Sequence, residues 1–158
     1  MTTGNLRQKL QLPEVGQIGV VVKEVDPVID FLQSTFGLGP FRVQEGEAPN
    51  VWDRGREKHI KARLAFATLG QVELELIQIL EGDSVHFEFL REHGEGLHHL
   101  GFVVKDFQAK LAQAKAMGFQ VLQTGPGGRL YAYLDTREVS GVIIELIEDM
   151  GAPDQVAR

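Results

Sequence analysis

The chain contains an internal repeat that preserves polar positions as well as apolar ones. Residues 17–25 read QIGVVVKEV, and residues 99–107 read HLGFVVKDF, 82 positions further along. A second similarity joins LELIQ at residues 74–78 to IELIE at residues 144–148. Recurrence of two segments in the same order indicates that one structural unit occurs twice in the fold. Because polar residues recur in register, the repeat also predicts a site built between the two copies.

Size, charge and composition exclude several classes of protein. With 158 residues, the chain has the length of a single domain, residues 1–158. A formal net charge of −6 argues against a nucleic-acid partner, since binding to phosphates needs a basic surface. The chain has no cysteine, which excludes disulfides and thiolate ligands. It shows neither an apolar run of membrane length nor a secretory signal, so we expect a cytoplasmic protein with no membrane partner.

Each copy of the repeat is predicted to contain a strand, a helix and three further strands. Module one lies at about 15–80 and opens with a strand rich in β-branched residues at 15–22. Asp26 should cap the following helix, with Pro27 at its first helical position and Gly37 at its end. The remaining strands of module one are expected at 41–44, 60–69 and 71–80, with a loop or loosely paired edge at 48–58.

A linking helix at about 83–93 connects module one to module two, which lies at about 97–148. Asp83 or Ser84 can cap this linking helix. Module two should contain a strand at 97–104, a helix that Asp106 caps and Gly118 ends, a glycine-rich turn at 125–128, and strands at 120–123, 130–134 and 142–147. We expect a loosely held lead and a frayed tail at the two ends of the chain, residues 1–13 and 149–158.

These elements predict an α+β fold of two tandem βαβββ modules. The strands are apolar on both faces, which indicates sheets that are covered on both sides or that curl around a site. We therefore expect two curved mixed sheets that lie side by side and enclose a cleft.

Four polar residues occupy equivalent places in the two copies: Gln17 and His99 begin the first similarity, and Glu75 and Glu145 lie in the second. A carboxylate such as Glu145 among apolar strand neighbours is costly to bury unless an opposite charge compensates it. A divalent cation would do so, and amide oxygen, carboxylate and imidazole are competent ligands. Taken singly, each residue is more simply an exposed strand residue or a satisfied core residue. Their recurrence in register favours a shared site.

Other polar residues have plainer explanations. We expect His98 to point away from His99 and Glu73 to be a solvated strand residue, with a supporting or alternative base as its second possibility. Trp52 fits two places equally well, the mouth of a pocket or a contact between the subunits of a dimer. The remaining histidines are expected at the surface: His59, His86 and His93. Residues near the glycine-rich turn can contact a substrate anion or ring but need no such role: Arg129, Tyr131 and Tyr133.

The segment GEGLHHLGFVVKDF, the IEL of the last strand and the duplicated βαβββ pattern resemble the vicinal oxygen chelate superfamily. That superfamily includes glyoxalases, extradiol dioxygenases, antibiotic-resistance proteins and methylmalonyl-CoA epimerases. The resemblance covers about 15–148, and GDSVHFEFLREHGEGLHHLGF and GVIIELIE are most similar to methylmalonyl-CoA epimerase. It implies that the metal ligands are Gln17, Glu75, His99 and Glu145. His99 rather than His98 matches the ligand, because His99 aligns with Gln17 in the repeat.

Two features differ from the epimerases. Gln17 stands where they usually have histidine, so the donor set resembles that of zinc-type lactoylglutathione lyase instead. The stretch Tyr133-Leu134-Asp135-Thr136 stands where the epimerases tend to read F-L-H-P. These differences leave the superfamily resemblance in place and the substrate open.

The resemblance implies a metal-dependent isomerase or epimerase that abstracts a proton next to a carbonyl. The substrate would be a small acyl-thioester or 2-oxo compound, with Glu145 as ligand and base and Glu75 as its counterpart across the metal. The alternatives are a glyoxalase-type lactoylglutathione lyase and a metal-free small-molecule binding or resistance protein. The donor set accommodates zinc, cobalt, nickel, manganese or magnesium. Since the family often pairs modules across a dimer, we expect a homodimer.

Overall fold

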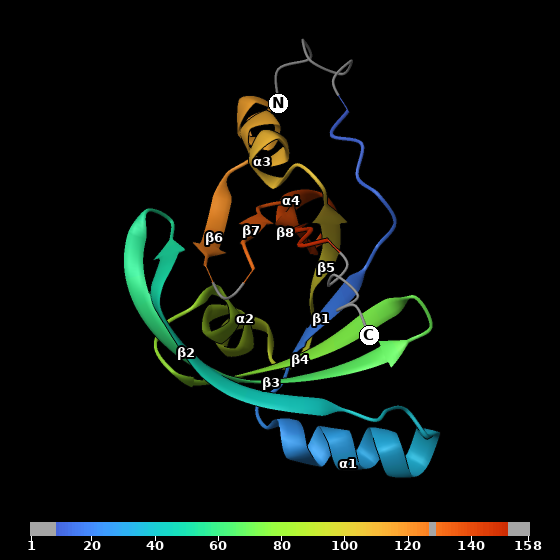
Figure 1. Cartoon of the computed structure of the whole chain (residues 1–158). Helices are drawn as coiled ribbons and strands as arrows, with labels where there is room; N and C mark the ends of the chain where they lie inside the picture. The colour runs from blue at the N-terminus through green and yellow to red at the C-terminus, as the bar shows by residue number, and fades with distance from the viewer. Residues whose placement is uncertain (1–8, 127–128, 152–158) are drawn as a thin grey trace, which may run out of the picture.

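A single mixed sheet of eight strands closes into a barrel in the computed structural model, which describes residues 9–126 and 129–151 (Figure 1). The strands are β1 (Gln17–Val21), β2 (Arg42–Asp53), β3 (Arg56–Leu69), β4 (Val72–Glu81), β5 (Gly96–Val104), β6 (Val121–Gly125), β7 (Tyr131–Leu134) and β8 (Ile143–Glu148). Neighbouring strands follow the order β1-β4-β3-β2-β6-β7-β8-β5. β1 is parallel to β4 and β5 is parallel to β8, while the other neighbours are antiparallel.

The predicted mixed α+β fold is confirmed, whereas the expected pair of separate sheets is replaced by one continuous sheet. Two seams join the halves: β1 pairs with β5 along its whole length, and β2 pairs with β6 through Trp52–Thr124 and Asp53–Gln123. Both seams connect segments far apart in the sequence, so no local pattern indicates them. The element order repeats the pattern strand, helix, three strands, with an added short helix in the second half. Descent of the halves from one duplicated module stays a prediction.

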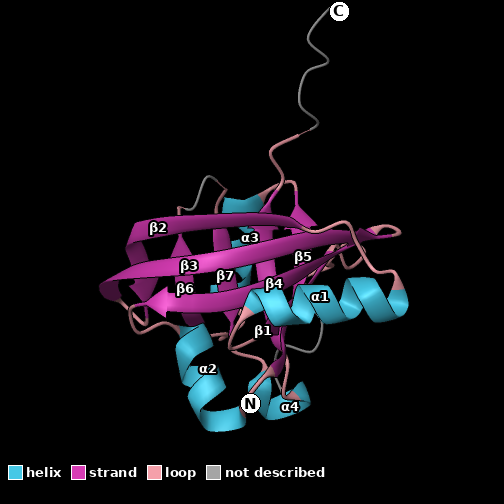
Figure 2. Cartoon of the chain, turned by 90° about the horizontal axis from the view of Figure 1, so that it is seen from below, coloured by secondary structure: helices cyan, strands magenta, loops and turns pink. Residues whose placement is uncertain are grey.

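The helices lie around the closed sheet (Figure 2), two of them on its outer face and one, which links the two halves of the chain, on inward-facing side chains. The helices are α1 (Val25–Phe36), α2 (Val85–His93), α3 (Phe107–Ala116) and α4 (Arg137–Ser140). α1 buries Ile29 against Ala65 and Leu76 of β3 and β4. α3 buries Leu111 against β7 and β8, in a cluster with Ala132, Leu134 and Leu146. α2 packs through Val85 on side chains that include Tyr133 and Ile143.

The predicted helix caps are confirmed in part. The Ser84 hydroxyl caps α2 by accepting a hydrogen bond from the backbone N–H of Phe87 at 3.2 Å. α1 begins two residues earlier than expected, at Val25, and Asp26 does not cap it. The Asp26 carboxylate instead accepts a hydrogen bond from Arg63 of β3 at 2.8 Å. A tertiary ion pair has therefore taken the place of the local cap.

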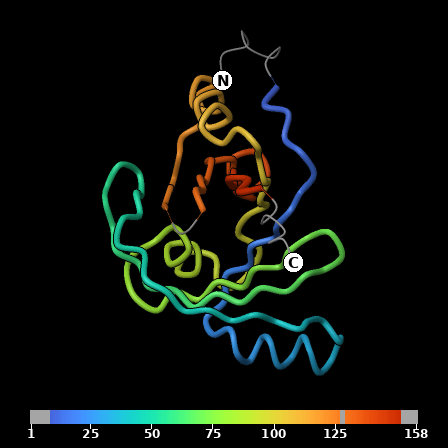
Figure 3. The backbone as a smooth tube through the Cα atoms, viewed as in Figure 1, coloured from blue at the N-terminus to red at the C-terminus, as the bar shows by residue number. Residues whose placement is uncertain are grey.

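The segment expected as a loop or loose edge at 48–58 is part of a long hairpin. β2 has 12 residues and β3 has 14, and a tight turn at Arg54 and Gly55 joins them (Figure 3). Most side chains of β2 are exposed on both faces, so the strand lacks the alternation that identifies a half-buried strand. The hairpin is anchored near its tip, where Val51 and Asp53 are buried and Lys58 donates to Asp53 at 2.7 Å.

Several predictions lie wholly or partly outside the described residues, namely parts of the lead at 1–13, the glycine-rich turn at 125–128 and the tail at 149–158. Within the described ranges, no helix has the length and apolar character needed to cross a membrane. A cytoplasmic location and a homodimer stay predictions.

Candidate functional site

A first cross-strand row on the inner face contains two of the predicted residues. Gln17 of β1 pairs with Gly101 of β5, and Gly101 pairs with Glu145 of β8. Paired residues of neighbouring strands place their side chains on the same face of a sheet. A Cβ at Gly101 would lie 2.8 Å from Ile147 Cδ1, 3.0 Å from Gln17 Cβ and 3.1 Å from Glu145 Oε2. The missing side chain therefore makes room for the two polar groups beside it.

A second row, next to the first, contains the other two predicted residues. Gly19 of β1 pairs with Glu75 of β4 on one side and with His99 of β5 on the other. The row continues from Glu75 to Phe66 of β3 and then to Arg42 of β2. The guanidinium carbon of Arg42 lies 4.7 Å from the centre of the Phe66 ring. The positively charged guanidinium of Arg42 therefore lies on the same face as Glu75, two strands away from it.

The structure brings all four predicted residues together around one imidazole nitrogen. His99 Nε2 lies 3.2 Å from Gln17 Oε1, 3.5 Å from Glu75 Oε2 and 3.0 Å from Glu145 Oε2. The side chain of His99 is fully buried, and those of Glu75 and Glu145 are only 12% and 6% exposed. Three oxygen atoms from three strands thus face one nitrogen atom in a place that is almost closed to water.

Glu73 fixes which end of the Gln17 amide faces the centre. Gln17 Nε2 donates a hydrogen bond to Glu73 Oε1 at 2.9 Å, which leaves Gln17 Oε1 towards His99. Glu73 is partly buried rather than solvated, so our first expectation for it is wrong and the supporting contact is the one observed. Because Glu73 accepts only, the orientation of the amide follows from the chemistry of its partner.

Burial and mutual charge shift the pKa values of the central groups. Burial raises the pKa of Glu75, and the nearby His99 opposes this rise. Burial alone would lower the pKa of His99, but the carboxylates of Glu145 and Glu75 outweigh it and raise the pKa to about 10. Burial, followed by the charges of Glu145 and Glu75, raises the pKa of Tyr133 well above its ordinary value. The centre therefore favours a positive charge between its two carboxylates.

The donor set fits a divalent cation. Glu145 Oε2 is buried and has no hydrogen-bond partner among the described residues, although it approaches His99 Nε2 as an ion pair. A buried carboxylate oxygen without a hydrogen bond is costly unless a cation satisfies it. Three oxygen donors and one imidazole suit several divalent metals. The fit rests on this unsatisfied oxygen and on the convergence of the donors.

Comparison with known families decides where the chain belongs. Residues 16–133 match the sequence model of the Glyoxalase/Bleomycin resistance protein/Dioxygenase superfamily. The chain belongs to this superfamily. The expected resemblance to the vicinal oxygen chelate proteins is thereby confirmed.

Several known proteins are similar to the chain at low identity. The uncharacterized protein YqjC of Bacillus subtilis is 29% identical over 138 residues, which cover 85% of this chain and 91% of YqjC. A Streptomyces coelicolor methylmalonyl-CoA epimerase variant in complex with 2-nitronate-propionyl-CoA has a TM-score of 0.71 at 24% identity, covering 89% of this chain and 100% of that one. The Mycobacterium tuberculosis methylmalonyl-CoA epimerase has a TM-score of 0.67 at 22% identity, covering 90% of each chain. At these identities the structural likeness shows the fold.

Three histidines of this vicinal oxygen chelate protein form a buried cluster that the sequence did not indicate. His86, His98 and His99 each offer a ring nitrogen within 4.8 Å of the others. The prediction that His86 lies at the surface is wrong, because α2 packs His86 inward and its Nε2 lies 2.9 Å from the Tyr133 hydroxyl. The prediction that His98 points away from His99 is also wrong, since their Nδ1 atoms lie 3.0 Å apart.

Two further histidines behave as predicted. His59 and His93 are exposed.

Trp52, 49% exposed, lines a hollow of about 430 Å³ with residues that include Lys115 and Tyr131, in agreement with a place at a pocket mouth. Tyr131 accepts a hydrogen bond from Gln123 Nε2 at 2.9 Å.

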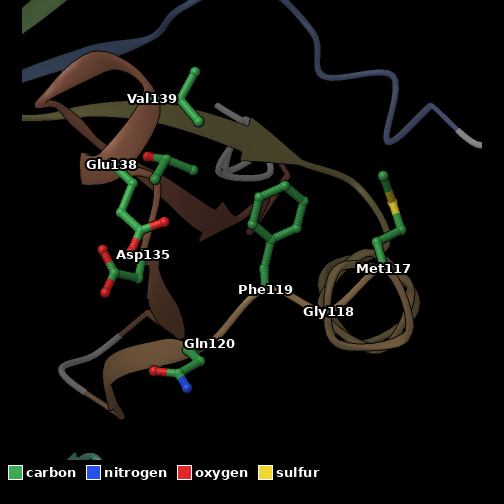
Figure 4. Close-up of a pocket in the computed structure, with 8 residues that line it drawn as sticks. Met117, Gly118, Phe119, Gln120, Asp135, Glu138 and Val139 are labelled. Atoms are coloured by element: carbon green, nitrogen blue, oxygen red, sulfur yellow. The ribbon is translucent and has the colours of Figure 1, made fainter. Parts of the chain in front are cut away.

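A separate hollow of about 360 Å³ lies between the end of α3 and α4 (Figure 4). Its lining includes Phe119, Asp135, Glu138 and Val139, whose side chains border one space in the close-up. None of the four converging residues lines it, so this hollow is distinct from the candidate site.

Proposed function

We propose that this chain is a metal-dependent epimerase or isomerase that removes and returns a proton next to a thioester carbonyl. The substrate is methylmalonyl-CoA or a related acyl-thioester. The observation that carries the proposal is the convergence of three oxygen donors within 3.0–3.5 Å of one buried imidazole nitrogen. Buried carboxylates are expensive unless they bind a cation or handle a proton. The methylmalonyl-CoA epimerases among the structural neighbours support a thioester substrate.

In this proposal, one divalent cation is held by Gln17, Glu75, His99 and Glu145. A cation bound there would supply a Lewis acid that stabilises negative charge on the carbonyl oxygen of the substrate. Glu73 accepts a hydrogen bond from Gln17 Nε2 and so orients the Gln17 amide with its oxygen towards the other ligands.

Glu145 and Glu75 act as a pair of proton carriers in this proposal. The Glu145 carboxylate takes the proton from the carbon next to the carbonyl, and the electrons of the broken C–H bond move towards the carbonyl oxygen to form an enolate. Glu75, which belongs to the other cross-strand row, returns a proton to the opposite face of the same carbon. The product then has the inverted configuration. Exchange with water or reaction in the reverse direction resets the two carboxyl groups.

Arg42 is proposed to bind an anionic group of the substrate at a distance from the reacting carbon. Its guanidinium stacks on Phe66, in the same row as Glu75. Within the described part of the chain, its side chain donates to the Gln44 amide oxygen at 2.8 Å rather than to a carboxylate. A planar, stacked guanidinium with free N–H groups is suited to a carboxylate or phosphate. An acyl-CoA carries such groups.

The test uses purified protein in deuterated water. We expect metal analysis to find about one divalent ion per chain, and methylmalonyl-CoA to incorporate deuterium next to the thioester as it epimerises. Removal of the ion with a chelator should stop the exchange, and added zinc or cobalt should restore it. Full exchange by the metal-free protein, or no exchange with several acyl-thioesters, would refute the proposal.

A glyoxalase-type reaction is the second candidate, because Gln17 contributes an amide oxygen where the epimerases usually have histidine. The same preparation should be given methylglyoxal with glutathione. Formation of lactoylglutathione without exchange of methylmalonyl-CoA would favour this alternative. Tight binding of a small molecule without metal and without turnover would favour a binding or resistance protein.

A further inference from the structure

A β-bulge in β5 brings the side chains of His98 and His99 close together. β1 pairs Gly19 with His99 but Val20 with Leu97, so His98 is an extra residue in the pairing. A bulge interrupts the alternation of side chains along a strand. Both histidines are buried, and their Nδ1 atoms lie 3.0 Å apart, which is hydrogen-bond distance.

The direction of this hydrogen bond follows from the proposed role of His99 as a ligand of the cation. A cation bound at the site takes the lone pair of His99 Nε2, so the ring proton of His99 must be on Nδ1. Nδ1 of His99 then donates, and Nδ1 of His98 accepts. The proton of His98 is consequently on its Nε2, which is buried and has no hydrogen-bond partner among the described residues.

The ring of His98 is itself held in place by aromatic neighbours. Phe89 meets it at 5.2 Å between ring centres and an interplanar angle of 89°, and Tyr133 at 5.4 Å and 88°. His86 lies 4.7 Å away at 42°. An apolar ring would fill this space without burying an unsatisfied N–H group, so packing does not account for a histidine here. The acceptor at Nδ1 is the property that only the histidine supplies.

We propose that His98 is a positioning residue that accepts a hydrogen bond from His99 Nδ1 and so aims His99 Nε2 at the cation. Metal-binding histidines generally donate their second ring N–H to a partner that fixes the ring and its tautomer. Here the partner is the preceding residue of the same strand, brought into reach by the bulge. The inference rests on the proposed function only for the presence of the cation.

Two substitutions separate the hydrogen bond from the packing. His98→Phe keeps an aromatic ring but removes the acceptor, while His98→Asn loses the ring but keeps an oxygen near the place of Nδ1. Cobalt binding, followed by absorbance without substrate, and zinc competition give the affinities. We expect His98→Phe to weaken binding about 10–100-fold and His98→Asn to stay within about threefold of the wild type. Equal affinity of His98→Phe and wild type, or a larger loss in His98→Asn, would overturn the proposal.

A measurement on the wild-type chain covers the case in which a variant does not fold. Long-range ¹H–¹⁵N spectra of the zinc-loaded protein report which ring nitrogens carry protons. We expect protons on Nδ1 of His99 and on Nε2 of His98. A proton on Nδ1 of His98 would overturn the proposal, as would failure of the wild type to bind either metal. A protein that binds zinc without epimerising any thioester would refute the proposed reaction and leave these results on His98 valid.

Discussion

Gly19 leaves the space that the His99 imidazole occupies. A Cβ on Gly19 would lie 2.0 Å from His99 Cε1, 2.3 Å from Nε2 and 2.4 Å from Nδ1, closer than any real contact. The two residues are cross-strand partners, so the ring lies across the backbone of β1 at this point. The imidazole reaches the Glu75 oxygen of β4 because β1, which lies between β5 and β4, carries no side chain here.

Replacement of Gly19 by alanine should displace His99. The methyl group forces the buried ring out of its place, with an expected loss of about 1–3 kcal/mol in the free energy of unfolding. Zinc affinity should fall about tenfold or more, since the imidazole no longer faces the oxygens. Calorimetric titration and denaturant unfolding give the two values. Gly46→Ala is the matched control in another strand, because a Cβ there meets nothing within 4 Å. Unchanged zinc affinity in Gly19→Ala would contradict this account of the site.

Glu145→Gln and Glu75→Gln should each stop epimerisation but retain proton exchange with one of the two epimers. If two carboxyl groups work on opposite faces, each variant still exchanges the proton of one epimer with deuterated water but cannot invert it. Turnover should fall about 10²–10⁴-fold in both. Glutamine retains an oxygen donor, so metal content is measured beside the rates. Wild-type epimerisation by either variant would exclude that residue as a proton carrier.

Arg42→Gln should weaken substrate binding without slowing the chemical step. Loss of a charge-assisted hydrogen bond, worth about 1.5–3 kcal/mol, predicts that KM for an anionic thioester rises about tenfold or more with kcat unchanged. Arg63→Gln is the control, since Arg63 lies on the same hairpin but is paired with Asp26 and Glu45. An equal effect of the two substitutions would indicate general electrostatics, and no effect of Arg42→Gln would remove this residue from the site.

The ion pair between Asp135 and Arg137 should make stability depend on acid pH. Arg137 donates to Asp135 at 2.8 and 2.9 Å, and this hydrogen bond lowers the pKa of Asp135 in the folded protein. Because the unfolded chain takes up the proton first, the stabilisation is present above the ordinary pKa of 3.8 and is lost as pH falls through the lower folded value. The partly exposed pair should contribute about 0.5–1 kcal/mol. Denaturant unfolding of Asp135→Asn should show a weaker pH dependence below pH 4 than the wild type. An identical dependence would assign the acid sensitivity to other carboxylates.

Some features of the fold could be predicted because their causes are local. The hydroxyl of Ser84 caps the helix that follows, and Gly37 ends α1 in a left-handed conformation at φ 67°. Apolar runs identified most strands. The short helix α4 and the long hairpin were not predicted, since β2 is exposed on both faces and carries no periodic pattern.

The repeat placed Gln17, Glu75, His99 and Glu145 at equivalent positions, and the structure brings these side chains together. That much follows from sequence, because residues in register in two copies of a unit take equivalent places in the fold. Their role as metal ligands stays a prediction. The supporting residues were misjudged: Glu73 is partly buried against Gln17, and His86 lies in the interior.

The sequence by itself determined most of the helices and strands, their order and the four polar positions, since these depend on spacing, capping and recurrence along the chain. Only the tertiary structure decided that one sheet closes through β1–β5 and β2–β6, that a bulge turns His98 towards His99, and that α2 carries His86 inward. Strand register and the packing of distant segments set these features. Contacts between residues so far apart depend on the whole folded chain and leave no signal in any short stretch of it.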